Sequence, residues 1–337
     1  MSTLQTEQRL ARADGFSSLP VQYFLTKRAP AVDVYAFFEG DAEPRLLAGR
    51  EHDAPAAELE GWKRSGLSHV LVRKSDAQRV RQQLAGCLDE LADDESLPAN
   101  DRVRVLQSLL ASTLEQRLSG ADADAWIAEA KSAAERIVRL SQQSGVTADS
   151  LFQLAQHDTT TFVHATNVAA YAVLLAVQLG TTDAEELRQI CSGALLHDYG
   201  KKFLPKALLT KRGRLDQQER ALIESHAQRG FEALAGRSGV TPGQLMMVYQ
   251  HHERLDGSGY PVALVGNEIH PWAKLLAVVD VFDALTAKRP YRLQAPVATA
   301  LTELTESAGV QFDEEVVQCW VSIFKRKSRK SVGSVST

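Results

Sequence analysis

The chain has 337 residues, of which 44% are hydrophobic and 24% are charged, as in typical soluble globular proteins. This composition excludes a disordered or collagen-like chain, and the length indicates about two domains. The 38 basic and 42 acidic residues give a net charge of −4, so we expect no DNA or RNA partner. Three widely spaced cysteines exclude a disulfide framework. Since no apolar run could cross a membrane and the N-terminus lacks the pattern of a signal peptide, we expect a cytoplasmic protein without membrane contact.

The first third of the chain combines short strand-like segments with one helical segment. Residues 32–39, 44–48 and 68–73 are rich in apolar residues and β-formers, and residues 56–66 have helical composition ending at a glycine. These segments predict a small β-β-α-β unit within about residues 18–85. Its histidines, His52 and His69, are isolated, and we assign no catalytic role to either.

The rest of the chain has the apolar periodicity of helices, beginning after the N-cap candidate Ser75-Asp76. Helices are predicted over 77–92, 101–118, 124–143, 148–155, 161–179 and 183–196. The expected architecture is mainly α, with an all-helical domain preceded by a small α/β domain. We expect an α/β accessory or regulatory domain over 1–90, linking helices over 91–145, the functional helical domain over 146–325 and a basic disordered tail over 326–337.

Histidines and carboxylates gather in the helical region. Six of the nine histidines lie between residues 157 and 252. His197-Asp198 ends an apolar helix, His251-His252 lies just before a helix stop, and Asp280 stands inside a very apolar helix. A buried carboxylate needs a cation or hydrogen-bond donors, and a metal ion satisfies a carboxylate and an imidazole together. Any one of these histidines alone would be read as a satisfied core residue. Together they predict a metal site.

Five motifs extend this pattern from about residue 145 to 320. They are TTTFVHATNVAAYA around His164, LLHDYGKK at 195–202, SHAQRG at 225–230, HHERLDGSGYP at 251–261 and VVDVFDALTAKRPYR at 278–292. In order and spacing they resemble the HD-GYP family of phosphodiesterases, a branch of the HD superfamily. The resemblance implies an all-helical HD-GYP domain with the helical bundle of that superfamily. The N-terminal unit resembles, more loosely, accessory domains that precede HD-GYP domains.

The resemblance also implies a ligand set for two divalent metal ions, with Asp198 bridging them and acting in catalysis. Iron or manganese suits these ligands best, and zinc or nickel is compatible with them. Some family members place a glutamate for a third metal where this chain has Thr160. A threonine hydroxyl is a poor ligand, so we expect two ions. The implied ligands are His164, His197, Asp198, His226, His251, His252 and Asp280.

Three basic residues match positions that contact the substrate in the family. Lys201 is the expected catalytic residue at the scissile phosphate, where an ammonium would stabilise negative charge. Its alternative role is a favourable charge at a helix C-terminus. Arg289 and Arg292 would bind phosphate or guanine, with surface arginines at a helix end as the alternative.

Further positions have expected roles around the site. Asp283 would orient a ligand histidine or, alternatively, cap the helix or pair with Arg289. Tyr199 is expected to pack, and the extra histidine His157 to lie at the surface or cap a helix. The signature loop is expected to need positive φ angles at its glycines and to shape the floor of the pocket. Its residues are Gly257, Gly259, Tyr260 and Pro261.

The activity implied by the resemblance is hydrolysis of cyclic di-GMP to pGpG, and in some members to GMP, through a hydroxide shared by two metals. One alternative is a receptor of low activity that binds cyclic di-GMP or a protein partner and signals through the N-terminal domain, which Thr160 favours because the family usually has tyrosine there. Another alternative is an HD phosphohydrolase for a different nucleotide, against which the GYP loop and the KRPYR segment argue. A homodimer and GGDEF-domain proteins are the partners that the resemblance implies.

Overall fold

The computed structural model describes residues 15–26, 31–38, 41, 43–50, 61–62, 67, 69–95, 97–118, 122–142, 161–211, 213–287 and 295–331. The chain divides into two compact units, Met1–Thr113 and Leu114–Thr337. The division falls inside the stretch 91–145, which the sequence predicts to be linking helices. In the described part of the chain, none of the helices is both long and apolar enough to span a bilayer.

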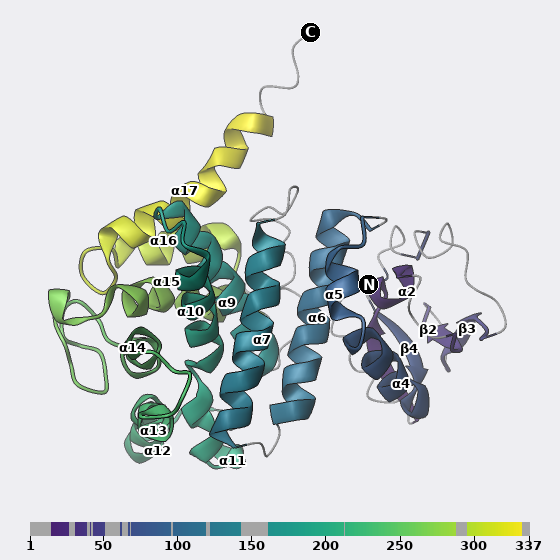
Figure 1. Cartoon of the computed structure of the whole chain (residues 1–337), viewed down its shortest axis with the longest axis horizontal. Helices are drawn as coiled ribbons and strands as arrows, with labels where there is room; N and C mark the ends of the chain where they lie inside the picture. The colour runs from purple at the N-terminus through teal and green to yellow at the C-terminus, as the bar shows by residue number, and fades with distance from the viewer. Residues whose placement is uncertain are drawn as a thin grey trace, which may run out of the picture. The chain divides into compact units, whose positions relative to one another are not determined.

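The first unit contains a four-stranded antiparallel sheet. Its strand order is β1-β4-β2-β3, formed by Phe16–Pro20, His69–Arg73, Val34–Ala36 and Arg45–Ala48. The short helix α2 (Gln22–Leu25) follows β1, and α4 (Lys74–Ala85), α5 (Leu88–Ala92) and α6 (Ala99–Leu118) follow β4 (Figure 1). Leu19, Val70 and Val72 are buried and form a core with Val80 and Leu84 of α4, and Leu71 between the two valines is buried as well.

This unit differs in detail from the sequence prediction. Strand β1 and helix α2 were not predicted, because FSSLP is too short and too polar to show a strand pattern. The helix expected over 77–92 is two helices, which separate at Gly86-Cys87. The helix expected over 56–66 lies largely outside the described residues, although Gly61 and Trp62 are helical.

The second unit is a helical bundle, confirming the mainly α fold. Helices α7, α9, α14 and others pack around α10, which is almost completely buried along its second half (Figure 1). Aspartates cap several of these helices: Asp122 begins α7, Asp183 begins α10 and Asp216 forms a capping box at α12. The elements are α7 (Ala123–Ser141), α9 (Thr161–Gln178), α10 (Ala184–Leu196), η1 (Tyr199–Phe203), α11 (Lys206–Leu209), α12 (Gln217–Glu224), α13 (His226–Leu234), α14 (Pro242–Gln250), η2 (Gly266–Glu268), α15 (Pro271–Thr286), α16 (Val297–Glu306) and α17 (Glu314–Ser331).

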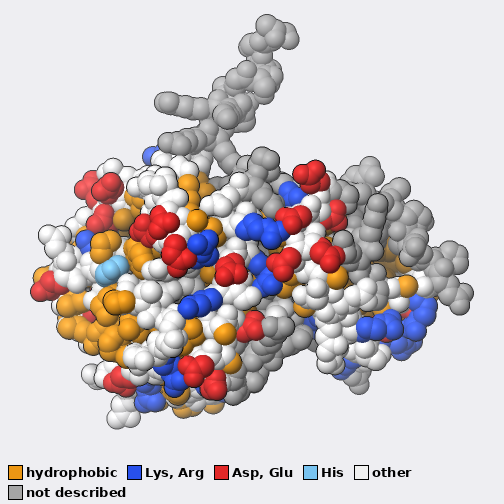
Figure 2. All heavy atoms as spheres, in the orientation of Figure 1, with side chains coloured by type: hydrophobic (Ala, Val, Ile, Leu, Met, Phe, Trp, Pro, Cys, Tyr) orange, Lys and Arg blue, Asp and Glu red, His pale blue; other side chains and the backbone are white. Residues whose placement is uncertain are grey.

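The C-terminal end of the chain is more helical than its composition suggests. Helix α17 continues to Ser331, so the first six residues of the expected disordered tail are helical, and residues 332–337 lie outside the described residues. Over the helical unit, the face in Figure 2 intersperses acidic and basic side chains.

Two glycines let η1 lie directly against α13. A Cβ at Gly200 would overlap the backbone carbonyl oxygen of His226 and lie 2.7 Å from the backbone nitrogen of Gly230. Both contacts are backbone atoms, which cannot rotate away. This close approach sets the spacing between the Asp198 end of η1 and the first residue of α13.

We therefore expect Gly200→Ala to lower the free energy of unfolding by about 1–3 kcal/mol or more, because η1 and α13 must separate to admit the methyl group. Chemical denaturation of the purified variant measures this loss. The control is Gly61→Ala, where a Cβ would meet nothing within 4 Å. Wild-type stability of Gly200→Ala would contradict the close packing of these two elements.

Candidate metal centre

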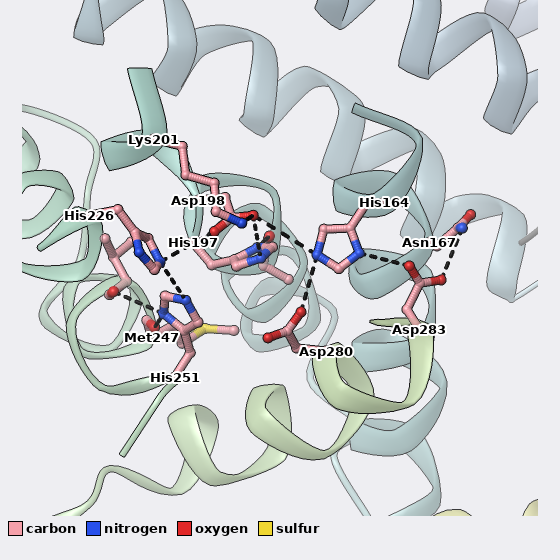
Figure 3. A network of polar contacts seen from close by, with 12 residues as sticks. His164, Asn167, His197, Asp198, Lys201, His226, Met247, His251, Asp280 and Asp283 are labelled. Atoms are coloured by element: carbon pink, nitrogen blue, oxygen red, sulfur yellow. Dashed lines mark hydrogen bonds and ion pairs between the residues drawn. The ribbon is translucent and has the colours of Figure 1, made fainter. Parts of the chain in front are cut away.

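The seven predicted ligands converge on one largely buried cluster, although they come from five different parts of the bundle. Figure 3 shows these ligands apart from His252. Most of them stand where a helix begins or ends: His197 directly follows α10, Asp198 precedes η1, His226 begins α13, and His251-His252 follows α14. His164 and Asp280 instead project from α9 and α15, which pack against each other. The bundle therefore surrounds the cluster with helix ends and two helix faces.

Hydrogen bonds to carbonyl groups fix three of the imidazole rings. The Nδ1 atoms of His197, His226 and His251 lie 2.6 Å, 2.8 Å and 3.0 Å from the backbone oxygens of Ala194, Ile223 and Val248. A carbonyl oxygen only accepts, so Nδ1 carries the proton in each ring. Each Nε2 atom then presents its lone pair to the centre of the cluster, which is the arrangement of metal-binding histidines.

Asp198 lies between two groups of ligands. Its Oδ1 atom is 3.4 Å from His226 Nε2, whereas its Oδ2 atom is 3.3 Å from His197 Nε2 and 3.9 Å from His164 Nε2. Figure 3 shows the Asp198 carboxylate between His226 on one side and His164 on the other. Three overlapping sets of candidate ligand atoms have all their members within 4.8 Å of one another, namely His226, His251 and His252; His164, His197 and Asp280; and His197, Asp198 and His251.

The cluster leaves polar atoms that a cation would satisfy. Among the described residues, His197 Nε2 and Asp198 Oδ1 are buried without a hydrogen-bond partner, since their ion-pair contacts lack hydrogen-bond geometry. His226 Nε2 and His251 Nε2 face each other at 3.3 Å, although both rings use Nδ1 as the donor. Two lone pairs directed at each other repel unless a cation lies nearby. These residues therefore fit divalent metal ions.

The charge states of the clustered side chains are also consistent with binding of divalent metal ions. Burial alone would raise the pKa of Asp198, but the charges of His197 and Lys201 hold that pKa well below its usual value. Burial lowers the pKa of His251 far below its usual value and that of His252 to about 3. At neutral pH the Asp198 carboxylate is therefore ionised and the imidazoles of His251 and His252 are neutral, which are the forms that bind metal.

Asp283 contacts His164, which is the geometry expected if it orients a ligand histidine. Its Oδ2 atom is 2.7 Å from His164 Nδ1, and His164 Nε2 is 3.1 Å from Asp280 Oδ1. Burial alone would lower the pKa of His164, but hydrogen bonds with Asp280 and Asp283 raise it to about 10. The other Asp283 oxygen accepts from Asn167 Nδ2 at 3.0 Å. Sequence reasoning missed Asn167, although it stands one helical turn after His164.

Lys201 contacts the cluster through Asp198. Its Nζ atom lies 2.5 Å from Asp198 Oδ2, and 30% of its side chain is exposed. The predicted substrate-binding lysine therefore lies at the edge of the cluster. Its ammonium group contacts Asp198, the carboxylate that lies between the two groups of ligands. Its neighbour Lys202 points elsewhere, with Nζ 5.4 Å from the centre of the Tyr199 ring.

The signature loop closes over His252. In the described part of the chain the ring nitrogens of His252 make no hydrogen bond, and its ring lies against Tyr260 with centroids 4.7 Å apart. The Tyr260 backbone nitrogen donates to the His252 carbonyl oxygen at 3.2 Å. The buried Glu253 carboxylate accepts from the backbone nitrogens of Val262 at 2.7 Å and Leu264 at 3.0 Å. Glu253 stands directly after the two histidines, but no local sequence pattern indicates that its carboxylate binds the loop.

The two glycines of this loop are required for different reasons. Gly257 has a φ of 75°, as expected. Gly259 does not have a positive φ, which corrects the prediction. A Cβ there would instead lie 2.5 Å from the Arg254 nitrogen and 2.6 Å from the His252 carbonyl oxygen. Gly259 thus allows the loop to fold back against the ligand histidine, and Pro261 follows Tyr260 in the same turn.

Several predicted residues are placed elsewhere or lie outside the described residues. Tyr199 is buried and packs edge-on against Trp126 at 5.1 Å, which confirms a packing role. His69 belongs to β4 in the first unit, whereas the residues of the cluster belong to the second unit. The following predicted or discussed residues lie outside the described part of the chain: His52, His157, Thr160, Arg289 and Arg292.

A family model described as an HD domain matches residues 134–316, which is more than half of the chain and contains the whole cluster. The chain belongs to the HD domain family. The match begins in α7 and ends in α17, so this HD domain comprises most of the helical unit.

Curated relatives match about half of this chain with moderate identity. Cyclic di-GMP phosphodiesterase PA4108 of Pseudomonas aeruginosa is 36% identical over 172 residues, 51% of this chain and 41% of the relative. The cyclic di-GMP phosphodiesterase response regulator RpfG of Xanthomonas campestris is 42% identical over 148 residues, 43% of this chain and 39% of the relative. The 3'3'-cGAMP-specific phosphodiesterase 3 of Vibrio cholerae is 37% identical over 164 residues, 48% of this chain and 34% of the relative. The matches therefore span less than half the length of these relatives.

A solved structure has the same fold over nearly the whole chain. It is Bd1817 of Bdellovibrio bacteriovorus, described as an HDG"Y"P protein, with a TM-score of 0.62 and 20% sequence identity. The alignment covers 92% of this chain and 99% of that one. This likeness shows the fold, while the HD domain model and the curated relatives agree with the HD-GYP family that the sequence motifs predicted.

Proposed function

We propose that the protein is a metal-dependent phosphodiesterase that hydrolyses a cyclic dinucleotide, with cyclic di-GMP as its substrate and pGpG as its first product. The observation that carries this proposal is the Asp198 carboxylate, whose two oxygens face two different sets of ligand atoms. That arrangement suits two metal ions bridged by one carboxylate. Relatives named as cyclic di-GMP phosphodiesterases support the choice of substrate.

The ligands would be divided between two ions. His164, His197 and Asp280 would hold one ion, and His226, His251 and His252 the other. Two bound ions supply Lewis-acid stabilisation of the charge that develops on the phosphate oxygens. We propose iron or manganese as these ions, because imidazole and carboxylate ligands without thiolate suit both; zinc and nickel remain compatible.

The chain's own residues would orient the substrate. Lys201 would place its ammonium on a non-bridging phosphate oxygen, because the partly exposed side chain already reaches the edge of the cluster. Arg289 and Arg292 would bind phosphate or guanine through their planar guanidinium groups. A homodimer, GGDEF-domain partners and the proposed domain limits of 1–90, 91–145 and 146–325 stay predictions.

The test is an anaerobic preparation of the full chain, in which iron, manganese and zinc are counted per chain and cyclic di-GMP hydrolysis is followed by product chromatography. The proposal expects about two ions per chain and the appearance of pGpG or GMP. Because one relative is named as specific for 3'3'-cGAMP, that nucleotide is assayed beside cyclic di-GMP. A higher kcat/KM for 3'3'-cGAMP would overturn the assigned substrate while leaving the reaction class intact.

Two other results would overturn the proposal itself. Two ions per chain with saturable binding of cyclic di-GMP and no product would establish a receptor, which is the alternative that Thr160 favours. No bound metal under any condition would show that the histidine cluster is a structural feature.

A further inference from the structure

Asn167 is a buried polar residue that is connected to the predicted ligand His164 through Asp283. Its side chain is 1% exposed, and its Nδ2 atom donates to Asp283 Oδ1 at 3.0 Å. Asp283 is completely buried, and its second oxygen, Oδ2, lies 2.7 Å from His164 Nδ1. Figure 3 shows the three side chains in a row that ends at the His164 ring.

The row begins and ends on the same helix. His164 and Asn167 are three residues apart on α9 and therefore share one face, while Asp283 reaches them from α15. One carboxylate thus accepts from both side chains. With its Oδ1 atom held by the amide, Asp283 keeps Oδ2 towards His164, and the Nδ1 atom of that ring carries the proton. The Nε2 atom of His164 then faces Asp280 at 3.1 Å.

Loss of the Asn167 amide would change the orientation of the His164 ring more than the stability of the fold. Asp283 Oδ1 would become a buried acceptor without its donor, and such an acceptor favours rotation of the carboxylate towards another partner. Rotation of Asp283 would release the Nδ1 atom of His164 from its orienting contact. Partners of this kind set the tautomer and the direction of a metal-binding imidazole.

We propose that Asn167 is a positioning residue for the metal centre, acting through Asp283 to hold His164 in the orientation that binds metal. This inference rests on the proposed function, because it assumes that His164 is a ligand. A purely structural role for Asn167 is the competing explanation, and it predicts a loss of stability with unchanged metal affinity.

The experiment measures Mn²⁺ binding to the metal-depleted full chain by titration calorimetry. Asn167→Leu keeps the branching at Cγ but removes the donor, and we expect it to weaken Mn²⁺ binding by about 10–100-fold. The matched control is Thr166→Val. Thr166 is the equally buried neighbour, and its hydroxyl donates within α9 to the Val163 carbonyl oxygen. This control is expected to bind Mn²⁺ like the wild type, even if it melts at a lower temperature.

Asp280→Asn, which alters a proposed ligand itself, distinguishes the two possible failures. Weaker Mn²⁺ binding by Asp280→Asn together with wild-type affinity of Asn167→Leu would overturn the role of Asn167 alone. Wild-type affinity in both variants would refute the metal centre and with it the proposed function. Equal weakening by Thr166→Val and Asn167→Leu would overturn the positioning role in favour of a general packing effect. Where leucine prevents folding, the smaller Asn167→Ala is titrated in its place.

Discussion

Asp198→Ala is expected to abolish hydrolysis and to reduce the bound metal to at most about one ion per chain, because it removes the carboxylate between the two ligand groups. The helical content should hardly change. Asp198 follows α10 and precedes η1, and its side chain caps neither element. Metal analysis and circular dichroism of the same preparation measure both effects, with product chromatography for the activity.

The control for this variant is Asp216→Ala. Asp216 forms the capping box of α12, a helix without buried residues, so its loss lowers stability by about 1 kcal/mol without reaching the cluster. The control should retain its metal and its activity. A metal chelator should lower the melting temperature of the wild type and of Asp216→Ala, but hardly that of Asp198→Ala. Wild-type activity of Asp198→Ala would exclude the assigned metal centre.

The close grouping of the proposed ligands could be predicted from the sequence because these residues stand in motifs with local causes. His197-Asp198 and His251-His252 both follow helices, and the structure places each pair at the C-terminal end of its helix. Asp280 stood out because an isolated carboxylate in an apolar helix needs a partner. Each of these signals is contained within a few residues of chain.

The contacts that support the ligands could not be predicted in the same way. The Asn167–Asp283 hydrogen bond joins residues that are 116 positions apart, and no local pattern indicates which amide reaches which carboxylate. Gly259 was expected to adopt a positive φ, but it is required because the loop folds back onto the His252 carbonyl group. Such requirements appear only after the tertiary packing is known.

In the first unit, too, the elements with local sequence signals could be predicted, whereas an element that depends on long-range pairing could not. Strands β2, β3 and β4 fall within predicted segments, since their apolar residues form short recognisable runs. Strand β1 has the sequence FSSLP, and it becomes a strand by pairing along its whole length with β4. Long-range pairing therefore overrides weak local propensity there.

Lys201→Ala is expected to lower kcat by about 100-fold while the metal content stays close to that of the wild type, because a preorganised cation would stabilise charge that develops on the phosphate. The lysine Nζ atom lies 2.5 Å from Asp198 Oδ2, an oxygen that faces the ligand cluster. Removing this ammonium removes a competitor for that oxygen, so the affinity for metal should not fall. Steady-state kinetics and metal analysis separate the two quantities.

The neighbouring Lys202 provides the matched control, because its Nζ atom lies over the Tyr199 ring rather than on Asp198. Lys202→Ala removes an equal charge from the same turn of η1 and should leave kcat almost unchanged. If both variants lost stability equally and retained kcat, Lys201 would serve only as a favourable charge at a helix end. If Lys201→Ala instead lost metal together with activity, the lysine would support the ligand Asp198 and not the phosphate. A fall in kcat confined to Lys201→Ala, at unchanged metal content, is the pattern that only a role at the phosphate produces.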